Sequence, residues 1–166
     1  MKTIFGVTGK SCSGKSSFCR KFTRNGGVYI SIDELCHQVL AEKHDEACAL
    51  LDMPLSSTRK EIGEKVFTDR AKYDTLVRLT WAPVEKLVLS AIDAAEDDVY
   101  LDYILLPLAK SIWEKCDIKI LVDAPLETRK QRAFERDNLT PAQFSLRESK
   151  SIEYDSFEFD YKVFTQ

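Results

Sequence analysis

Eight residues near the start of the chain form a complete phosphate-binding motif, G-x-x-x-x-G-K-[ST]. They are Gly9, Lys10, Ser11, Cys12, Ser13, Gly14, Lys15 and Ser16. The apolar run 4–8 before the motif is typical of a buried strand, and 16–22 after it is typical of a helix. A glycine-rich turn at a helix N-terminus points backbone N–H groups at one spot, where the helix dipole adds positive charge. The motif therefore predicts a site for the phosphates of a nucleotide.

Two side chains of this motif carry specific chemistry. Lys15 is placed to reach the terminal phosphates, and the Ser16 hydroxyl is placed to bind Mg²⁺. We expect the loop, extended to Ser17, to bind ATP. A chance match in a loop rich in glycine and serine is the alternative, and the strand–loop–helix context argues against it. Cys12 is either a small filler at a variable position or a reactive thiol, and we favour the filler.

Length and composition favour a single globular domain over residues 1–166. The formal net charge of -3 argues against broad nucleic-acid binding, and no apolar run is long enough to span a bilayer. Since the N-terminus enters a strand at once, we expect no signal peptide. The five cysteines include no C-x-x-C pair, which indicates free thiols and a cytoplasmic protein. The oligomeric state stays open.

Strand-like and helix-like segments alternate along the chain, which predicts an α/β fold with a parallel sheet covered on both faces. The predicted strands are 4–8, 28–32, 99–104, 118–123 and 161–164. From about 44 to 97 the chain has helical periodicity and almost no strand signal, so we expect a helical insertion after the second strand. Its last three helices are predicted to run from Ser57 or Thr58 to Phe67, from Asp69 to Thr80, and from Pro83 to about Ala95. A further helix is predicted from Pro107 to Lys115.

Three aspartates stand at or near the ends of predicted strands, where open α/β sheets bind their ligands. Asp33 is either a carboxylate that accepts a proton from a substrate hydroxyl or a plain helix N-cap. Asp102 either binds Mg²⁺, directly or through water, or is a turn residue at a strand end. For Asp123, followed by Ala124 and Pro125, we favour the capping role.

A basic helix follows the fourth predicted strand. Its residues Arg129, Arg132 and Arg136 are spaced i, i+3 and i+7, so they share one face. Arg147 and Lys150 lie on the helix predicted to open at Thr140–Pro141.

We expect this hinged pair of helices, about 126–151, to close as a lid over ATP. Arg132 would bind the phosphates there, and Arg136 would stabilise charge on the transferred phosphoryl group. The alternative is an ordinary solvated face, neutralised in part by Glu127, Glu135 and Glu148.

Several sequence segments, taken in their order along the chain, resemble segments of the dephospho-CoA kinase family. Residues 4–17 resemble that family's strand and phosphate loop, and 28–34 its V-I-D-A-D-E segment, with Asp33 keeping the second Asp. Residues 59–69, 101–106 and 122–140 are similar to its R-x-x-L-x-x-x-V-F-x-D, L-D-x-P-L-L and V-D-A-P…R-x-x-R-D-x-L-T patterns. The chain departs from the family's usual His-Pro, which is Ala82-Pro83 here, and from its P-L-L-F-E run.

The resemblance implies a five-stranded parallel sheet of the nucleoside-monophosphate-kinase type. It also implies ATP-dependent phosphorylation of the ribose 3′-hydroxyl of dephospho-CoA, a small-molecule reaction with no nucleic-acid or membrane partner. Another small-molecule kinase with a phosphate loop, acting on a nucleoside, nucleotide or vitamin precursor, is the alternative. A nucleotide-binding switch is a third interpretation, but the chain shows no N-K-x-D guanine motif.

Overall fold

A computed structural model describes residues 1–149 and 151–166. The chain divides into two compact units, one formed by Met1–Ser31 with Ile92–Gln166 and the other by Ile32–Ala91. The second unit begins at Ile32, before the start of the expected insertion at about 44. Each unit has its own arrangement of elements and is described by itself.

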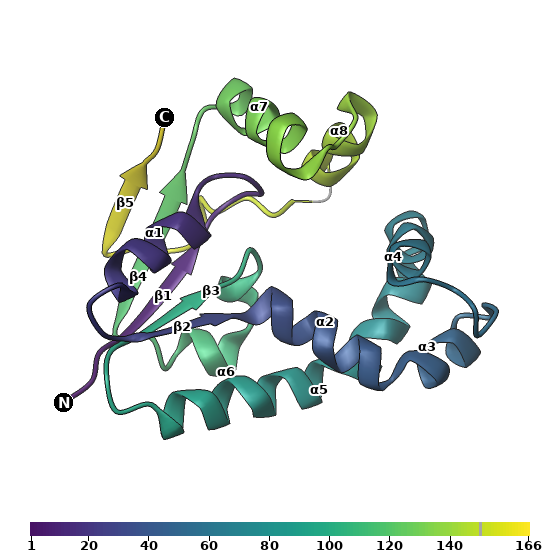
Figure 1. Cartoon of the computed structure of the whole chain (residues 1–166), viewed down its shortest axis with the longest axis horizontal. Coiled ribbons are helices and arrows are strands. Elements are labelled where there is room, and N and C mark those ends of the chain that lie inside the picture. The colour runs from purple at the N-terminus through teal and green to yellow at the C-terminus, as the bar shows by residue number, and fades with distance from the viewer. Residues whose placement is uncertain (150) are drawn as a thin grey trace. The chain divides into compact units, whose positions relative to one another are not determined.

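The first unit is built on a five-stranded sheet in the order β2-β3-β1-β4-β5 (Figure 1). Every neighbouring pair of strands is parallel, which confirms the predicted sheet. The strands are β1 (Ile4–Thr8), β2 (Val28–Ser31), β3 (Val99–Asp102), β4 (Ile118–Asp123) and β5 (Tyr161–Phe164). The first strand is central, so the loop that follows it opens at the middle of the carboxyl edge, where such sheets bind ligands.

Side chains alternate between the two faces of the sheet because successive residues of a strand point in opposite directions. On one face Val7 and Tyr100 pack with Cys19 of helix α1 (Lys15–Thr23). On the other face Gly6 lies close to Trp113 and Cys116, in and just after α6 (Lys110–Trp113). The missing side chain at residue 6 therefore lets this layer approach the sheet.

The helix expected over 107–115 is interrupted. It consists of the short 3₁₀ turn η1 (Leu106–Leu108) and α6, separated by Ala109. Ala109 has φ −80° and ψ 70°, which lies outside the helical region. The prediction of a continuous helix is therefore wrong, although the two pieces begin only one residue before the expected start and end before the expected end.

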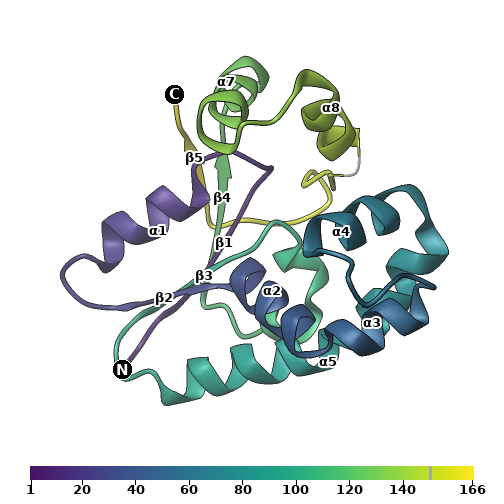
Figure 2. The ribbon, with the colours of Figure 1, turned by 45° about the vertical axis from the view of Figure 1, so that its right-hand side comes forward.

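Two helices follow β4 as predicted, α7 (Leu126–Asp137) and α8 (Pro141–Ser149). Asn138 ends α7 in the left-handed conformation, with φ 52°, which is a common helix C-cap. At the start of α8 the Thr140 hydroxyl accepts from the Gln143 N–H, and the Gln143 side chain accepts from the Thr140 N–H. Both views place α7 beyond the carboxyl end of β4 (Figures 1 and 2).

The second unit is helical and holds α2 (Ile32–Glu42), α3 (His44–Leu50), α4 (Arg59–Thr68) and most of α5 (Arg70–Ala94). Cys48, Leu51, Ile62 and Val66 form its buried core. Thr58, one of the two caps that the sequence offered, starts α4 and forms a complete capping box with Glu61.

The two helices expected on either side of Pro83 are a single helix, α5. A proline inside a helix removes one backbone hydrogen bond and usually kinks or ends the helix. Here Val84, Val88 and Ile92, at four-residue intervals, are at most 2% exposed. This buried stripe lies entirely on the C-terminal side of Pro83 and packs that half of α5.

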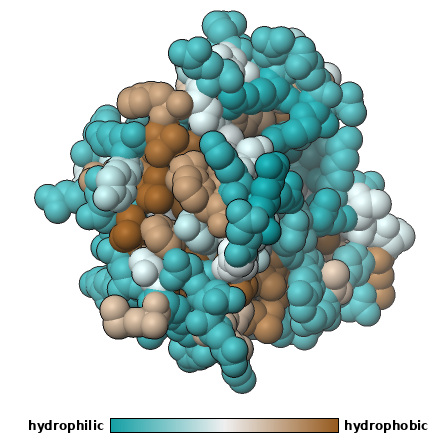
Figure 3. Space-filling view, turned by 60° about the vertical axis from the view of Figure 1, so that its left-hand side comes forward, coloured by the Kyte–Doolittle hydropathy of each residue, from teal (hydrophilic) through white to brown (hydrophobic). Residues whose placement is uncertain are grey.

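Apolar side chains are exposed on β5 and on α1. β5 is an edge strand, and three of its four residues are exposed. Figure 3 shows apolar surface on the side of the molecule that carries β5 and α1. Phe164 of β5 and Phe22 of α1 are exposed apolar residues of these elements.

Candidate active site

The phosphate-binding loop between β1 and α1 has a conformation that its glycines require. Gly9 has φ 152°, and a Cβ at this position would lie 2.0 Å from the Val122 carbonyl oxygen. Gly14 precedes α1 with φ 102°, a value that side-chain-bearing residues rarely adopt. Cys12 adopts the left-handed conformation with φ 62° and packs with Ala133 and Phe144. The loop therefore presents the N-terminus of α1 as the motif predicted.

The hydroxyl and the carboxylate that the sequence suggested for Mg²⁺ lie side by side. Ser16 Oγ donates to Asp102 Oδ2 at 2.7 Å, and Asp102 is 5% exposed at the carboxyl end of β3. The Tyr29 hydroxyl donates to the same oxygen at 2.7 Å. Burial and the neighbouring Asp102 carboxylate raise the pKa of Tyr29 to about 12, so the hydroxyl keeps its proton at neutral pH. Sequence reasoning missed Tyr29, because the pairing of β2 with β3 is a long-range property.

Other polar groups of the loop are buried near the same place. Lys15 is buried, and its Nζ donates to the Lys10 carbonyl at 3.1 Å. Ser13 is fully buried, and within residues 1–149 and 151–166 its hydroxyl oxygen has no hydrogen-bond partner. The outer residues Ser11 and Ser17 are half-buried and exposed, respectively.

Arg132 of α7 reaches the loop backbone. Its Nη1 donates to the Cys12 carbonyl at 3.1 Å and to Thr165 Oγ1 at 3.0 Å. Thr165 in turn donates to the Ser13 carbonyl at 2.6 Å. The structure thus joins Arg132 and the end of β5 to the phosphate loop, and the threonine carried no recognisable signal in the sequence.

Arg136 lies one turn further along α7, also beside the loop. Its Nε donates to Asp137 Oδ1 at 2.9 Å, and its Nη2 lies 3.6 Å from Cys12 Sγ. The hydrogen bond to Arg136 holds the pKa of Asp137 below its ordinary value. The side chain of Arg136 is 59% exposed, so its guanidinium is accessible to a ligand at the loop.

Arg129, the third arginine of the predicted basic face, is buried and ion-paired and does not face a ligand. It is 4% exposed, and its two amino groups donate to Glu148 at 2.7 and 2.8 Å. Glu148 also lies 3.5 Å from Lys10, whose ammonium contacts Glu153 at 3.0 Å. Arg129 therefore joins α7 to α8, and Glu148 neutralises it. Lys150 lies outside the described residues.

Asp33 and Asp123 have different surroundings. Asp33 lies in the second unit, in the first turn of α2, which begins one residue earlier. Its side chain is 70% exposed, and Oδ2 is 3.7 Å from His37 Nε2. Asp33 is therefore inside the helix and does not precede it as an N-cap. Asp123 Oδ1 accepts from the Ala124 N–H at 2.8 Å. The N-cap of α7 is Pro125, with no side-chain cap hydrogen bond, so the capping role expected for Asp123 is wrong.

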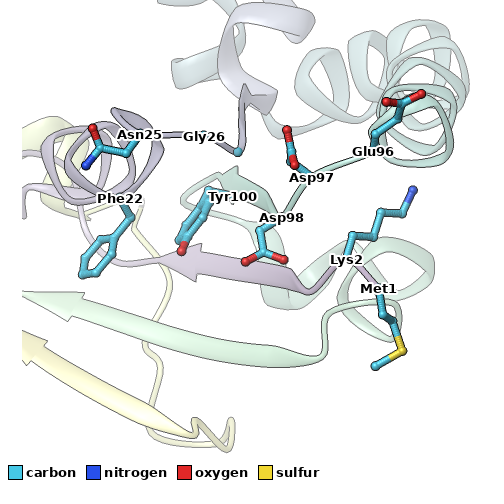
Figure 4. A pocket seen from close by; sticks show the side chains of 10 residues that line it. Met1, Lys2, Phe22, Asn25, Gly26, Glu96, Asp97, Asp98 and Tyr100 are labelled. Atoms are coloured by element: carbon cyan, nitrogen blue, oxygen red, sulfur yellow. The ribbon is translucent and has the colours of Figure 1, made fainter.

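A separate pocket of about 400 Å³ lies at the opposite, amino-terminal edge of the sheet (Figure 4). Phe22 and Tyr100 line it together with Gly26, Asp97 and Asp98. Ligands of open α/β sheets bind at the carboxyl edge, so this pocket is not the nucleotide site.

The chain matches the model of one protein family, dephospho-CoA kinase, over residues 3–156. Dephospho-CoA kinase of Idiomarina loihiensis is 28% identical over 146 residues, which cover 82% of this chain and 72% of that protein. The enzyme of the same name from Aquifex aeolicus is 28% identical over 148 residues, covering 82% of this chain and 74% of its own.

Solved structures share the fold. TT1252 from Thermus thermophilus superimposes with a TM-score of 0.86 at 22% identity, covering 99% of this chain and 89% of that one. Dephospho-CoA kinase from Campylobacter jejuni gives a TM-score of 0.59 at 23% identity, with coverage of 99% and 89%. Among the described residues, no helix has both the length and the apolar character needed to cross a membrane.

Proposed function

The chain belongs to the dephospho-CoA kinase family, and we propose which of its residues carry out that family's reaction. The reaction transfers the γ-phosphoryl group of ATP to the ribose 3′-hydroxyl of dephospho-CoA, giving ADP and CoA. The hydroxyl oxygen forms a new bond to phosphorus, the bond from phosphorus to the bridging β–γ oxygen breaks, and the hydroxyl proton leaves. The chain is thus a phosphotransferase with an alcohol acceptor.

The observation that carries this proposal is the meeting of three elements at the phosphate loop. α1 begins at Lys15, Asp102 ends β3 within 2.7 Å of Ser16, and Arg132 of α7 contacts the Cys12 carbonyl. We assign ATP binding to the loop from Gly9 to Ser17, with Lys15 on the terminal phosphates. Since phosphoryl transfer depends on positioning and charge stabilisation, this cluster is where catalysis would take place.

Ser16 and Asp102 are the residues that would hold Mg²⁺. A hydroxyl and a carboxylate 2.7 Å apart offer the hard oxygen atoms that Mg²⁺ prefers, usually beside substrate phosphates. When bound, the ion would neutralise charge on the phosphates. Asp102 is buried next to the loop, so its charge needs a compensating partner in the working site.

We assign to Asp33 the task of orienting the acceptor hydroxyl and receiving its proton. Asp33 follows β2 by two residues, and the last residue of that strand, Ser31, is the register partner of Asp102. Its exposed carboxylate is accessible to a second substrate. A carboxylate placed on the nucleophile is a recurring part of phosphoryl-transfer sites. The exposed cations Arg59, Lys60 and Lys65 of α4 are candidate partners for the acceptor's phosphates.

Arg132 and Arg136 are proposed to act on the phosphoryl group during transfer. Both project from α7 to the loop, where a guanidinium can match phosphate oxygens in a two-pronged geometry. We propose that α7 and α8 act as the lid. We also place the protein in the cytoplasm, because its five cysteines are odd in number and include no C-x-x-C pair.

A binding screen tests the acceptor. Thermal shifts would be measured for the protein with Mg²⁺ and ADP, adding dephospho-CoA, nucleosides or nucleoside monophosphates in turn. Dephospho-CoA should give the largest rise in melting temperature. A larger rise with a nucleoside or nucleotide would favour another small-molecule kinase while leaving the ATP site in place.

A further inference from the structure

Tyr29 contacts the Asp102 carboxylate from the neighbouring strand. Its hydroxyl and that of Ser16 both donate to Asp102 Oδ2, each at 2.7 Å. The register partner of Tyr29 across the ladder is Tyr100, two residues before Asp102. Two residues of a strand span about 6.6 Å, so the tyrosine ring extends along the sheet to reach the carboxylate.

The ring of Tyr29 is supported on its other side by α1. The guanidinium of Arg20 lies 5.4 Å from the ring centroid, a cation–π contact. Arg20 follows Ser16 by four residues, so the two side chains share one face of the helix. A chain of contacts therefore runs from Ser16 of α1 through Asp102 and Tyr29 back to Arg20 of the same helix.

We propose that Tyr29 is a positioning residue that holds Asp102 in its working orientation. A hydroxyl has one proton to donate and two lone pairs to accept, so Ser16 can bind a metal ion through its oxygen and still donate to Asp102 Oδ2. Tyr29 is the second donor to that oxygen, and two donors from different elements fix the direction of the other carboxylate oxygen. Without the Tyr29 hydroxyl, this buried carboxylate oxygen would lose one of its two donors and part of its orientation. This inference rests on the proposed role of Ser16 and Asp102 in holding Mg²⁺.

The test compares Tyr29→Phe with the wild type by a metal-binding measurement. Mn²⁺, which suits the same oxygen ligands and is visible by electron paramagnetic resonance, would be titrated into protein saturated with ADP. Loss of a hydrogen bond that orients a metal ligand typically weakens metal affinity roughly 10–100-fold. We expect a loss of that size for Tyr29→Phe and unchanged ADP affinity in the presence of a chelator. A structural defect of the loop would lower both affinities.

Tyr100→Phe is the matched control. Tyr100 pairs with Tyr29 across the ladder, and its ring stacks on Phe5 and Phe22. The control should bind Mn²⁺ as the wild type does, whereas an equal loss in both variants would overturn the proposal. Unchanged Mn²⁺ affinity in folded Tyr29→Phe would also overturn it.

A second variant covers the case in which Tyr29→Phe does not fold. Arg20 is exposed, so Arg20→Leu removes the support of the ring without opening the core. A lost cation–π contact should weaken Mn²⁺ binding roughly 2–5-fold, and an unchanged affinity would contradict the proposal. If the wild type with ADP binds no Mn²⁺, the metal assignment fails together with the inference. If the wild type binds Mn²⁺ and Tyr29→Phe binds it equally well, the metal assignment stands and only the role of Tyr29 is overturned.

Discussion

Arg129 of α7 and Glu148 of α8 form a two-pronged ion pair, with nitrogen–oxygen distances of 2.7 and 2.8 Å. The guanidinium is almost fully buried, and it also donates to the Ala124 carbonyl at 3.3 Å. The helices proposed as a lid are thus joined to each other by an ion pair between a buried guanidinium and a half-buried carboxylate, and this pair makes their stability depend on pH.

Acid should weaken this connection. The hydrogen bond from Arg129 lowers the pKa of Glu148 below its ordinary value of 4.5. A carboxylate with a depressed folded-state pKa stabilises the protein fully above its unfolded pKa and loses that contribution as pH falls through the folded value. Between about pH 5 and pH 3 the free energy of unfolding should therefore fall more steeply in the wild type than in Glu148→Gln. Urea unfolding followed by circular dichroism measures both.

Glu127→Gln is the control for this experiment, because Glu127 is exposed and its ion pair with Lys130 contributes little. Its pH dependence should follow that of the wild type. If the curves for Glu148→Gln and the wild type ran parallel below pH 5, the role assigned to the ion pair would be wrong.

Lys15→Ala should abolish most turnover while the protein stays folded. The ammonium is expected to neutralise charge on the transferring phosphoryl group, and removing one such donor costs roughly 100–1000-fold in kcat. Steady-state release of ADP measures the loss. Lys21→Ala, an exposed lysine of the same helix, should retain wild-type activity. Near-normal kcat in folded Lys15→Ala would remove the basis for the assignment.

Local patterns in the sequence were enough to predict the sheet and most helices. The phosphate loop, the five strands and the caps at Thr58 and Thr140 depend on short-range chemistry, and the structure has them as expected. Pro83 was misinterpreted as the start of a new helix, because proline favours the first turn of a helix, whereas α5 continues through it. Ala109 was missed because nothing in its side chain signals a break.

The site was harder to predict wherever a residue works through a distant partner. Arg129 shares its helical spacing with Arg132 and Arg136, and only the position of α8 distinguishes it by supplying Glu148. Tyr29 and Thr165 depend on strand register and on the approach of β5 to the loop. No local sequence motif predicts the strand register or the approach of β5 to the loop.

Asp33→Asn should lower kcat by roughly 100-fold or more if its carboxylate receives the acceptor proton. The KM for ATP should change little, because the side chain is assigned to the other substrate. Glu34→Gln is the matched control, since it removes the neighbouring charge in the same first turn of α2. Equal kcat values for both variants and the wild type would leave Asp33 with only a helix-dipole role.

Arg136→Ala should reduce kcat/KM by about 100-fold, because its charge is expected to matter more in the transition state than in substrate binding. Lys130→Ala, on the same helix but paired with Glu127, should be close to wild type. Hydrogen exchange at 137–140 should also slow when an ATP analogue and the acceptor are both bound. Unchanged exchange and a neutral Arg136→Ala would return this arginine to an ordinary solvated face.

The most direct measurement is the mass of the product formed from dephospho-CoA by the purified protein with ATP and Mg²⁺. We predict the gain of one phosphoryl group, carried on the ribose 3′-oxygen, with one ADP released for each CoA formed. Lys15→Ala should form the product at a far lower rate. Phosphorylation of a nucleoside or nucleoside monophosphate, with no turnover of dephospho-CoA, would contradict the proposed function.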